Sequence, residues 1–126
     1  MNKIFTSLLI FSILCTSGLL AQTSSLKVVT SVSESVSKDF KNSGRIFLFI
    51  GEQGNREPRY NTWPNKNNRI FATNIENWNP GKTFTFNKSV PLVKSVDVSL
   101  GDFPNGKYSM QVLWDQDTNE SGINAP

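Results

Sequence analysis

Residues 100–117 read Leu-Gly-Asp-Phe-Pro-Asn-Gly-Lys-Tyr-Ser-Met-Gln-Val-Leu-Trp-Asp-Gln-Asp, and this stretch indicates the fold most clearly. Its Pro104-Asn105-Gly106 segment has the residue types of a tight turn, because Pro fixes φ and Asn and Gly tolerate positive φ. Apolar and polar side chains then alternate along 107–115, except at Leu113, and this is the period of a half-buried strand. Tyr108, Met110, Val112 and Trp114 are expected on the buried face.

Outward from this stretch, the mature chain continues to alternate between strand patterns and turn residues. Leu26 to Val36 is rich in β-branched residues and predicts an edge strand, and Arg45 to Ile50 is a continuous apolar run that predicts a central strand covered on both faces. Further strands are expected at 69–75, 83–87 and 93–100. About seven strands predict an all-β domain, an immunoglobulin-like or transthyretin-like β-sandwich.

The core of this sandwich is expected to hold the inward-facing residues of the predicted strands. Truncating one buried aromatic residue in such a core should cost about 3–5 kcal/mol of stability. The expected core residues are Phe47, Phe49, Phe84, Phe86, Val96, Val98, Tyr108, Met110, Val112 and Trp114.

The first 21 residues have the form of a secretory signal. A short basic start with Lys3 precedes an apolar run from Ile4 to Leu20, and Ala21 is a suitable last residue before cleavage. We therefore expect an extracytoplasmic protein, periplasmic or secreted, that meets the membrane only during export. The β-sandwich domain is expected over 22–126, and the ending Ile123-Asn124-Ala125-Pro126 is compatible with a C-terminus that has been shortened.

Composition argues against several classes of function. The 126 residues include no histidine, and the single cysteine, Cys15, lies in the signal segment. Catalysis by histidine or by cysteine is therefore excluded for this chain alone, and the Gly-x-Ser-x-Gly elbow of serine hydrolases does not occur. A formal charge of +3, from 13 basic and 10 acidic residues spread along the chain, is too slight to indicate nucleic-acid binding.

The long irregular segment 51–68 and a nearby tryptophan contain the candidate ligand-binding residues. Basic and aromatic side chains interleave there, and such a set can stack on sugars or bases. The alternative interpretation is that Tyr60 and Trp63 pack inward and anchor the loop, while the arginines pair with Glu52 or Glu57. For Trp78 the same alternatives exist, and a position in the core or at an interface is favoured. The candidate residues are Arg56, Arg59, Tyr60, Trp63 and Trp78.

A weak candidate cation site follows the strand that ends near Trp114. Asp115, Asp117 and Asn119 place side-chain oxygens at every second residue, as the first half of a calcium loop does. The Gly and the bidentate Glu of an EF-hand are missing, so we favour a polar turn and expect no cofactor, with calcium as the alternative.

Several segments match a known family in their order and spacing. These segments are Gly44 to Phe49, Glu57-Pro58-Arg59, Phe71 to Gly81, Phe103 to Gln111 and Ile123 to Pro126. Together they resemble the N-terminal β-domain of secreted bacterial esterase-like proteins that carry an α/β-hydrolase domain. The resemblance implies a non-catalytic accessory domain, with a hydrolase domain as partner in cis or in trans, and an esterase or hydrolase activity for a full-length relative. The alternative is a free-standing module that binds a carbohydrate or another polymer.

Overall fold

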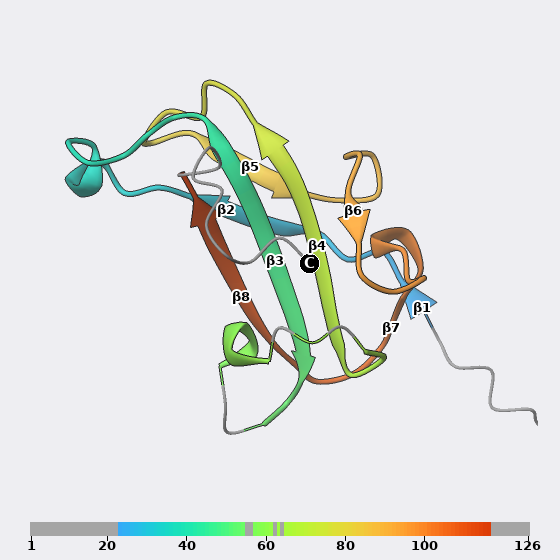
Figure 1. Cartoon of the computed structure of the whole chain (residues 1–126). Coiled ribbons are helices and arrows are strands. Elements are labelled where there is room, and N and C mark those ends of the chain that lie inside the picture. Colours follow the sequence, from blue (N-terminus) through green and yellow to red (C-terminus); the bar gives the residue numbers. More distant parts are fainter. Residues whose placement is uncertain (1–22, 55–56, 62, 64, 117–126) are drawn as a thin grey trace, which may run out of the picture.

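The computed structural model describes residues 23–54, 57–61, 63 and 65–116 (Figure 1). Within these ranges the regular elements are strands and three short 3₁₀ turns. No helix in this part of the chain is long and apolar enough to cross a membrane. The predicted signal segment 1–21 lies outside the described residues.

The largest element is a four-stranded antiparallel sheet in the order β6-β4-β3-β8. Strand β3 (Gly44–Glu52) is central and pairs with β4 (Asn68–Ile75) on one side and with β8 (Tyr108–Asp115) on the other. The short strand β6 (Val93–Lys94) continues the sheet beyond β4.

Two antiparallel pairs complete the fold. Strand β2 (Val28–Ser31) pairs with β5 (Thr83–Phe86), and this pair lies behind the large sheet in Figure 1. Strand β1 (Thr23–Ser24) pairs with β7 (Phe103–Pro104). The all-β prediction is confirmed. The 3₁₀ turns are η1 (Glu34–Val36), η2 (Pro58–Tyr60) and η3 (Leu100–Asp102).

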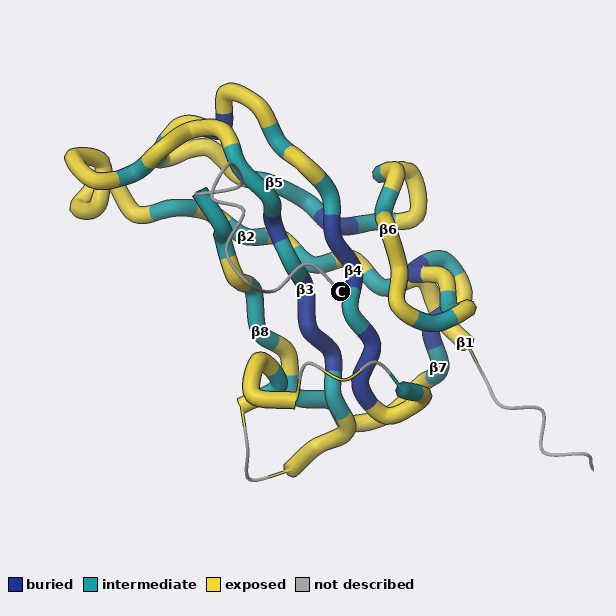
Figure 2. The backbone as a smooth tube through the Cα atoms, viewed as in Figure 1, coloured by how far each residue is buried: buried dark blue, intermediate teal, exposed yellow. Residues whose placement is uncertain are grey.

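The core lies between the large sheet and the β2–β5 pair. Ile46, Leu48 and Ile50 alternate along β3 and are fully buried, as is Phe86 of β5. Leu48 lies between Phe71 of β4 and Val112 of β8 in the register. The central position of β3 was predicted from its apolar run, and Figure 2 shows the buried stretch along β3 and β4.

The predicted core needs correction on β3, because the opposite set of residues faces the β2–β5 pair. Phe47 and Phe49 lie on the other surface of the large sheet, which we call the outer face, and their rings stack at 6.1 Å. Phe49 is 6% exposed and Phe47 is half-buried, so this face is only partly covered.

The predicted inward-facing residues of β8 are confirmed at three positions and wrong at one. Tyr108, Val112 and Trp114 pack against the core cluster, but Met110 is 43% exposed. Strand β8 forms the edge of its sheet, so a side chain there has a neighbouring strand on one flank only.

The predicted strand 93–100 is also wrong. Regular pairing ends at Lys94, whose Nζ lies 2.7 Å from Oδ1 of Asp97, and Val98 N donates to Val96 O. These local bonds curl the chain, and η3 follows. Val96 is therefore only half-buried and is not part of the core cluster, whereas Val98 packs against it.

Trp78 joins the two layers through a cluster of aromatic rings. Its ring centroid lies 5.2 Å from that of Trp114 in β8, 6.3 Å from Phe84 in β5 and 5.8 Å from Phe40. The Trp78 N–H donates to Asn42 O at 2.7 Å, and the indole Nε1 donates to Lys82 O at 3.0 Å. The positive φ of Asn77 and Gly81 lets the chain turn sharply on either side of it.

The start of β3 approaches β8 so closely that only glycine fits. A Cβ built on Gly44 would meet the backbone oxygen of Asp115 and would lie 2.8 Å from the Trp114 ring. We expect Gly44→Ala to lower the free energy of unfolding by about 1–3 kcal/mol, because strand or ring must shift. Urea unfolding followed by circular dichroism measures this change.

The matched control is Gly54→Ala, where an added Cβ would have only Glu52 O nearby, at 3.7 Å. Its stability should stay within about 0.5 kcal/mol of the parent. Equal unfolding midpoints for the two variants would contradict the close approach at Gly44.

Candidate functional site

The candidate site is the connection between β3 and β4, and η2 is its ordered half. Pro58 starts the turn with its fixed φ, and Tyr60 N and Asn61 N donate to Glu57 O and Pro58 O. The turn lies over the outer face, where Gln111 of β8 holds it. Gln111 Oε1 accepts from Arg59 N at 3.2 Å, and Gln111 Nε2 donates to Glu57 Oε2 at 3.4 Å.

The two aromatic side chains of this connection point into solvent. Tyr60 is 70% exposed and Trp63 is 79% exposed. The interpretation that they pack inward to anchor the loop is therefore wrong. The anchoring comes from backbone bonds and polar side chains, which leaves both rings available for contact with a ligand.

Arg59 orients Tyr60. Its guanidinium carbon lies 4.9 Å from the Tyr60 ring centroid, and Nη2 donates to the Tyr60 hydroxyl at 3.1 Å. Arg59 Nε also lies 2.8 Å from Glu57 Oε2. The hydrogen bond to Tyr60 and the charge of Glu57 raise the pKa of Arg59, so the group stays cationic. Glu57, Arg59 and Tyr60 thus form a chain of contacts along the surface.

The second half of the connection is built from asparagines that the sequence interpretation did not single out. Asn65 and Asn68 exchange backbone hydrogen bonds, and the Asn68 side chain is buried. Its Nδ2 donates to Asn61 O and, at 3.3 Å, to Trp63 O; Asn65 Nδ2 also donates to Trp63 O, at 3.2 Å. These bonds fix the backbone at Trp63. The Asn-rich tract was the only available signal, and it also fits an ordinary turn.

A polar hollow of about 530 Å³ lies beside these residues. Its lining includes the carboxylates of Glu52 and Glu57 and the amides of Asn61 and Asn67, which can form hydrogen bonds with hydroxyl groups. The amide of Asn68 also borders the hollow but is buried and bonded within the loop. Asn61 lies in this lining and between the two exposed rings in sequence. The lining residues are Gly51, Glu52, Gly54, Glu57, Pro58, Asn61, Asn67 and Asn68.

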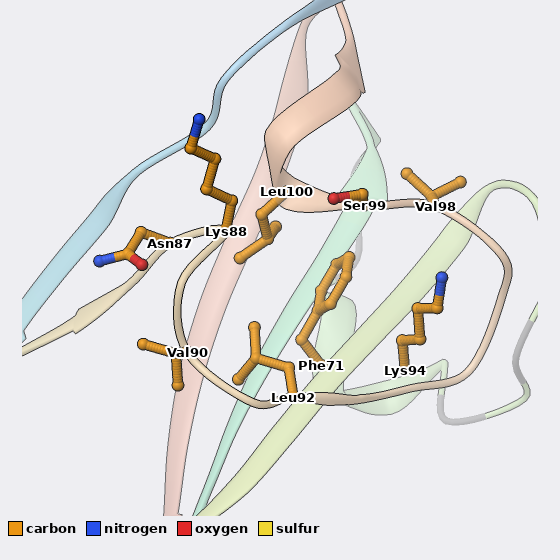
Figure 3. A pocket seen from close by; sticks show the side chains of 9 residues that line it. All are labelled: Phe71, Asn87, Lys88, Val90, Leu92, Lys94, Val98, Ser99 and Leu100. Atoms are coloured by element: carbon orange, nitrogen blue, oxygen red, sulfur yellow. The ribbon is translucent and has the colours of Figure 1, made fainter.

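A second pocket, shown in Figure 3, is smaller and mostly apolar. It encloses about 140 Å³ between β4 and the segment 87–100, with Phe71, Leu92 and Leu100 pointing into it. An apolar cavity of about this volume can hold benzene. The pocket is therefore too small for a sugar ring with its hydroxyl groups. Lys94 at its rim is paired with Asp97, and this bond lowers the pKa of the Asp97 carboxyl.

The structure does not bring all the predicted residues together. Trp78 is 6% exposed and belongs to the aromatic core, so its assignment as a ligand-binding residue is wrong. The indole is large enough to reach from its turn into the space between the layers. Arg56 lies outside the described residues, and Arg59, Tyr60 and Trp63 remain as the described candidates.

Arg69, at the end of the same basic and aromatic run, is turned into the interior. Its guanidinium carbon lies 5.2 Å from the Phe103 ring centroid and 5.5 Å from that of Tyr108. The residue is 9% exposed, and its Nε and Nη1 have no hydrogen-bond partner among the described atoms. Arg69 therefore helps to build the interior and does not contribute to the exposed loop surface.

The predicted cation site is mostly outside the described residues, since Asp117 and Asn119 follow Gln116. Asp115 is the last residue of β8 and lies opposite Arg45 in the register. No group of three or more acidic, cysteine or histidine residues that could hold a metal ion occurs in the described ranges.

Comparison with protein-family models, with curated proteins and with solved structures gives no match. The resemblance to the N-terminal domain of esterase-like proteins therefore remains a prediction from the motifs.

The loop and core tryptophans should respond differently to truncation. We expect Trp78→Ala to lower the free energy of unfolding by about 3–5 kcal/mol, because it empties the space between the two layers. Trp63→Ala should change it by less than about 0.5 kcal/mol, since that ring is exposed. Urea unfolding of both variants checks this, and comparable losses would contradict the exposed position of Trp63.

Proposed function

We propose that the chain is a non-catalytic extracytoplasmic module that binds a carbohydrate polymer through the β3–β4 connection. The observation that carries the proposal is the pair of exposed rings, Tyr60 and Trp63, held on a hydrogen-bonded loop beside a polar hollow. Two exposed aromatic rings close together on an ordered loop offer a flat apolar surface for contact. Loops positioned by a rigid scaffold commonly carry binding residues.

Carbohydrates match this combination of groups. A flat aromatic ring offers an apolar face to the C–H side of a sugar ring, and neighbouring amides and carboxylates bind its hydroxyl groups. Asn61 and Asn67 supply donors and acceptors in the hollow, and Glu52 and Glu57 supply acceptors. Tyr60 is further oriented by Arg59, which lowers the entropy lost when a ligand binds.

The module is proposed to act without chemistry of its own. The sequence has no histidine, no cysteine after Cys15 and no Gly-x-Ser-x-Gly elbow. The N-terminal signal pattern supports export to the periplasm or the medium, where polymeric glycans occur. We further assign the two packed layers to an immunoglobulin-like or transthyretin-like sandwich, an arrangement in which end loops commonly carry the binding residues.

A second candidate is the accessory domain of an esterase, and the outer face of the large sheet favours it. Phe47 lies opposite Ala72 and Leu113 there, and Phe49 lies opposite Ile70, so the middle of this face is apolar. Phe47 is only half-buried and Leu113 is 36% exposed. A hydrolase domain packed on this face, in cis or in trans, would cover these side chains.

The binding proposal predicts that affinity depends on the two exposed rings. In a glycan array followed by calorimetry with the best ligand, we expect Trp63→Ala to weaken binding at least about tenfold, because it removes the flat apolar face on which a sugar ring would pack. Tyr60→Ala should also weaken it. The control is Val36→Ala, which truncates an exposed residue of η1. Unchanged affinity in both loop variants would end the proposal.

The accessory role predicts an association that needs the outer face. When the exported chain is incubated with the α/β-hydrolase domain encoded with it or beside it, Leu113→Ser should weaken complex formation, because it removes an exposed apolar side chain from this face. Val29→Ser, an equally simple change at an exposed residue of β2, is the control. Analytical ultracentrifugation measures the complex, and equal association for both variants would contradict this role.

A further inference from the structure

Within the described part of the chain, strand β8 pairs with a neighbouring strand on one side only. It is the last strand of the four-stranded sheet, and its strand partner among the described residues is β3. The 3₁₀ turn η2 contacts both β8 and β3, but it lies over the outer face, where it binds the Gln111 side chain. It therefore does not take the hydrogen bonds at the edge.

Two hydrogen bonds fix which backbone groups of β8 point outward. Glu52 N donates to Asn67 O, and Ser95 N donates to Ile70 O. In an antiparallel sheet the direction of the backbone groups alternates along each strand. The backbone N–H and C=O groups of even-numbered β3 residues therefore point toward β4, and those of odd-numbered β3 residues point toward β8. In β8, the backbone groups of the odd-numbered residues point toward β3.

The even-numbered residues of β8 therefore direct their backbone groups to the open edge of the sheet, and we call them the outward-facing residues in this sense. Their backbone N–H and C=O groups have no hydrogen-bond partner among the described residues. Strand β8 contains no Pro and no Lys, the residues that most often protect an edge strand. The outward-facing residues are Tyr108, Met110, Val112 and Trp114.

We propose that β8 pairs antiparallel with β8 of a second copy of the chain. The strand is self-complementary in one register, which has Gln111 of each copy at the two-fold axis. Met110 then lies opposite Val112 of the second copy, and Tyr108 lies opposite Trp114. All four outward-facing residues gain a partner, and the cross-strand pairs on the core side are apolar.

Charge supports the same register. Lys107, directly before β8, falls opposite Asp115 of the second copy, which places unlike charges across the new pair. Shifting the register by one hydrogen-bonded pair would put Trp114 opposite Gly106, or Tyr108 opposite Gln116. Both of these residues lie outside the strand, so either shift would lose pairing.

The antiparallel pairing also determines the relative orientation of the two copies. Two antiparallel strands joined edge to edge in one sheet are related by a two-fold axis perpendicular to that sheet. The four strands of each copy therefore merge into one continuous sheet, and both outer faces lie on the same side. Since η2 sits on the outer face at Gln111, the two Tyr60 and Trp63 loops would also lie on that side, suited to one polymer chain.

The test is the mass of the exported, purified chain across a dilution series, measured by analytical ultracentrifugation. We expect a dimer that dissociates on dilution. Met110→Lys should weaken association at least about tenfold, because it places a charge at an edge that must pair with a second edge. Val36→Lys adds the same charge at a comparably exposed site of η1 and should leave the association constant unchanged.

Amide hydrogen exchange identifies the surface independently of any variant. The N–H groups of Met110 and Val112 should be protected in the dimer and lose protection on dilution, whereas those of Gln111 and Leu113 should stay protected because they bond to β3. A monomer at every concentration would overturn the proposal. A dimer that Met110→Lys does not weaken, or whose Met110 and Val112 amides exchange freely, would also overturn it.

Discussion

The packing of Trp78 between the two layers is the interaction on which the rest of the structure depends. Its ring contacts Trp114 of the large sheet and Phe84 of the β2–β5 pair, so one side chain connects both layers. Its backbone and its indole N–H are each hydrogen-bonded, to Asn42 and Lys82. Because a buried indole needs a partner for its N–H, the turn 76–82 is fixed together with the ring.

The strands could be predicted from the sequence wherever the spacing of hydrophobic residues alone determines the structure. The alternation in 83–87 and 107–115 corresponds to β5 and β8, and the apolar run 45–50 corresponds to the centre of β3. The sequence could not predict which face of β3 points to the core, because apolar residues occupy both faces of that strand. It also predicted a strand over 93–100. There Ser95 Oγ accepts from Ile70 N, and Lys94 binds Asp97, so the regular pairing ends early.

The candidate site shows a similar limit. Whether an aromatic residue in an irregular segment packs inward or points outward depends on tertiary contacts, which sequence spacing does not contain. Trp78 and Trp63 are both next to Pro or Asn in turn-like segments, yet one is buried and the other is exposed. The difference arises from partners distant in sequence. Trp114 and Phe40 enclose Trp78, whereas Asn68 binds only the backbone at Trp63.

The different surroundings of the three tryptophans have a spectroscopic consequence. Trp78 and Trp114 lie in one aromatic cluster, where the apolar surroundings should give blue-shifted emission that moves to longer wavelength on unfolding. Trp63, in water, should dominate the red edge of the spectrum and be open to quenchers such as iodide. The three tryptophans thus form two separate intrinsic fluorescence probes. The Trp78–Trp114 pair reports folding, and Trp63 reports events at the β3–β4 connection, without any added label.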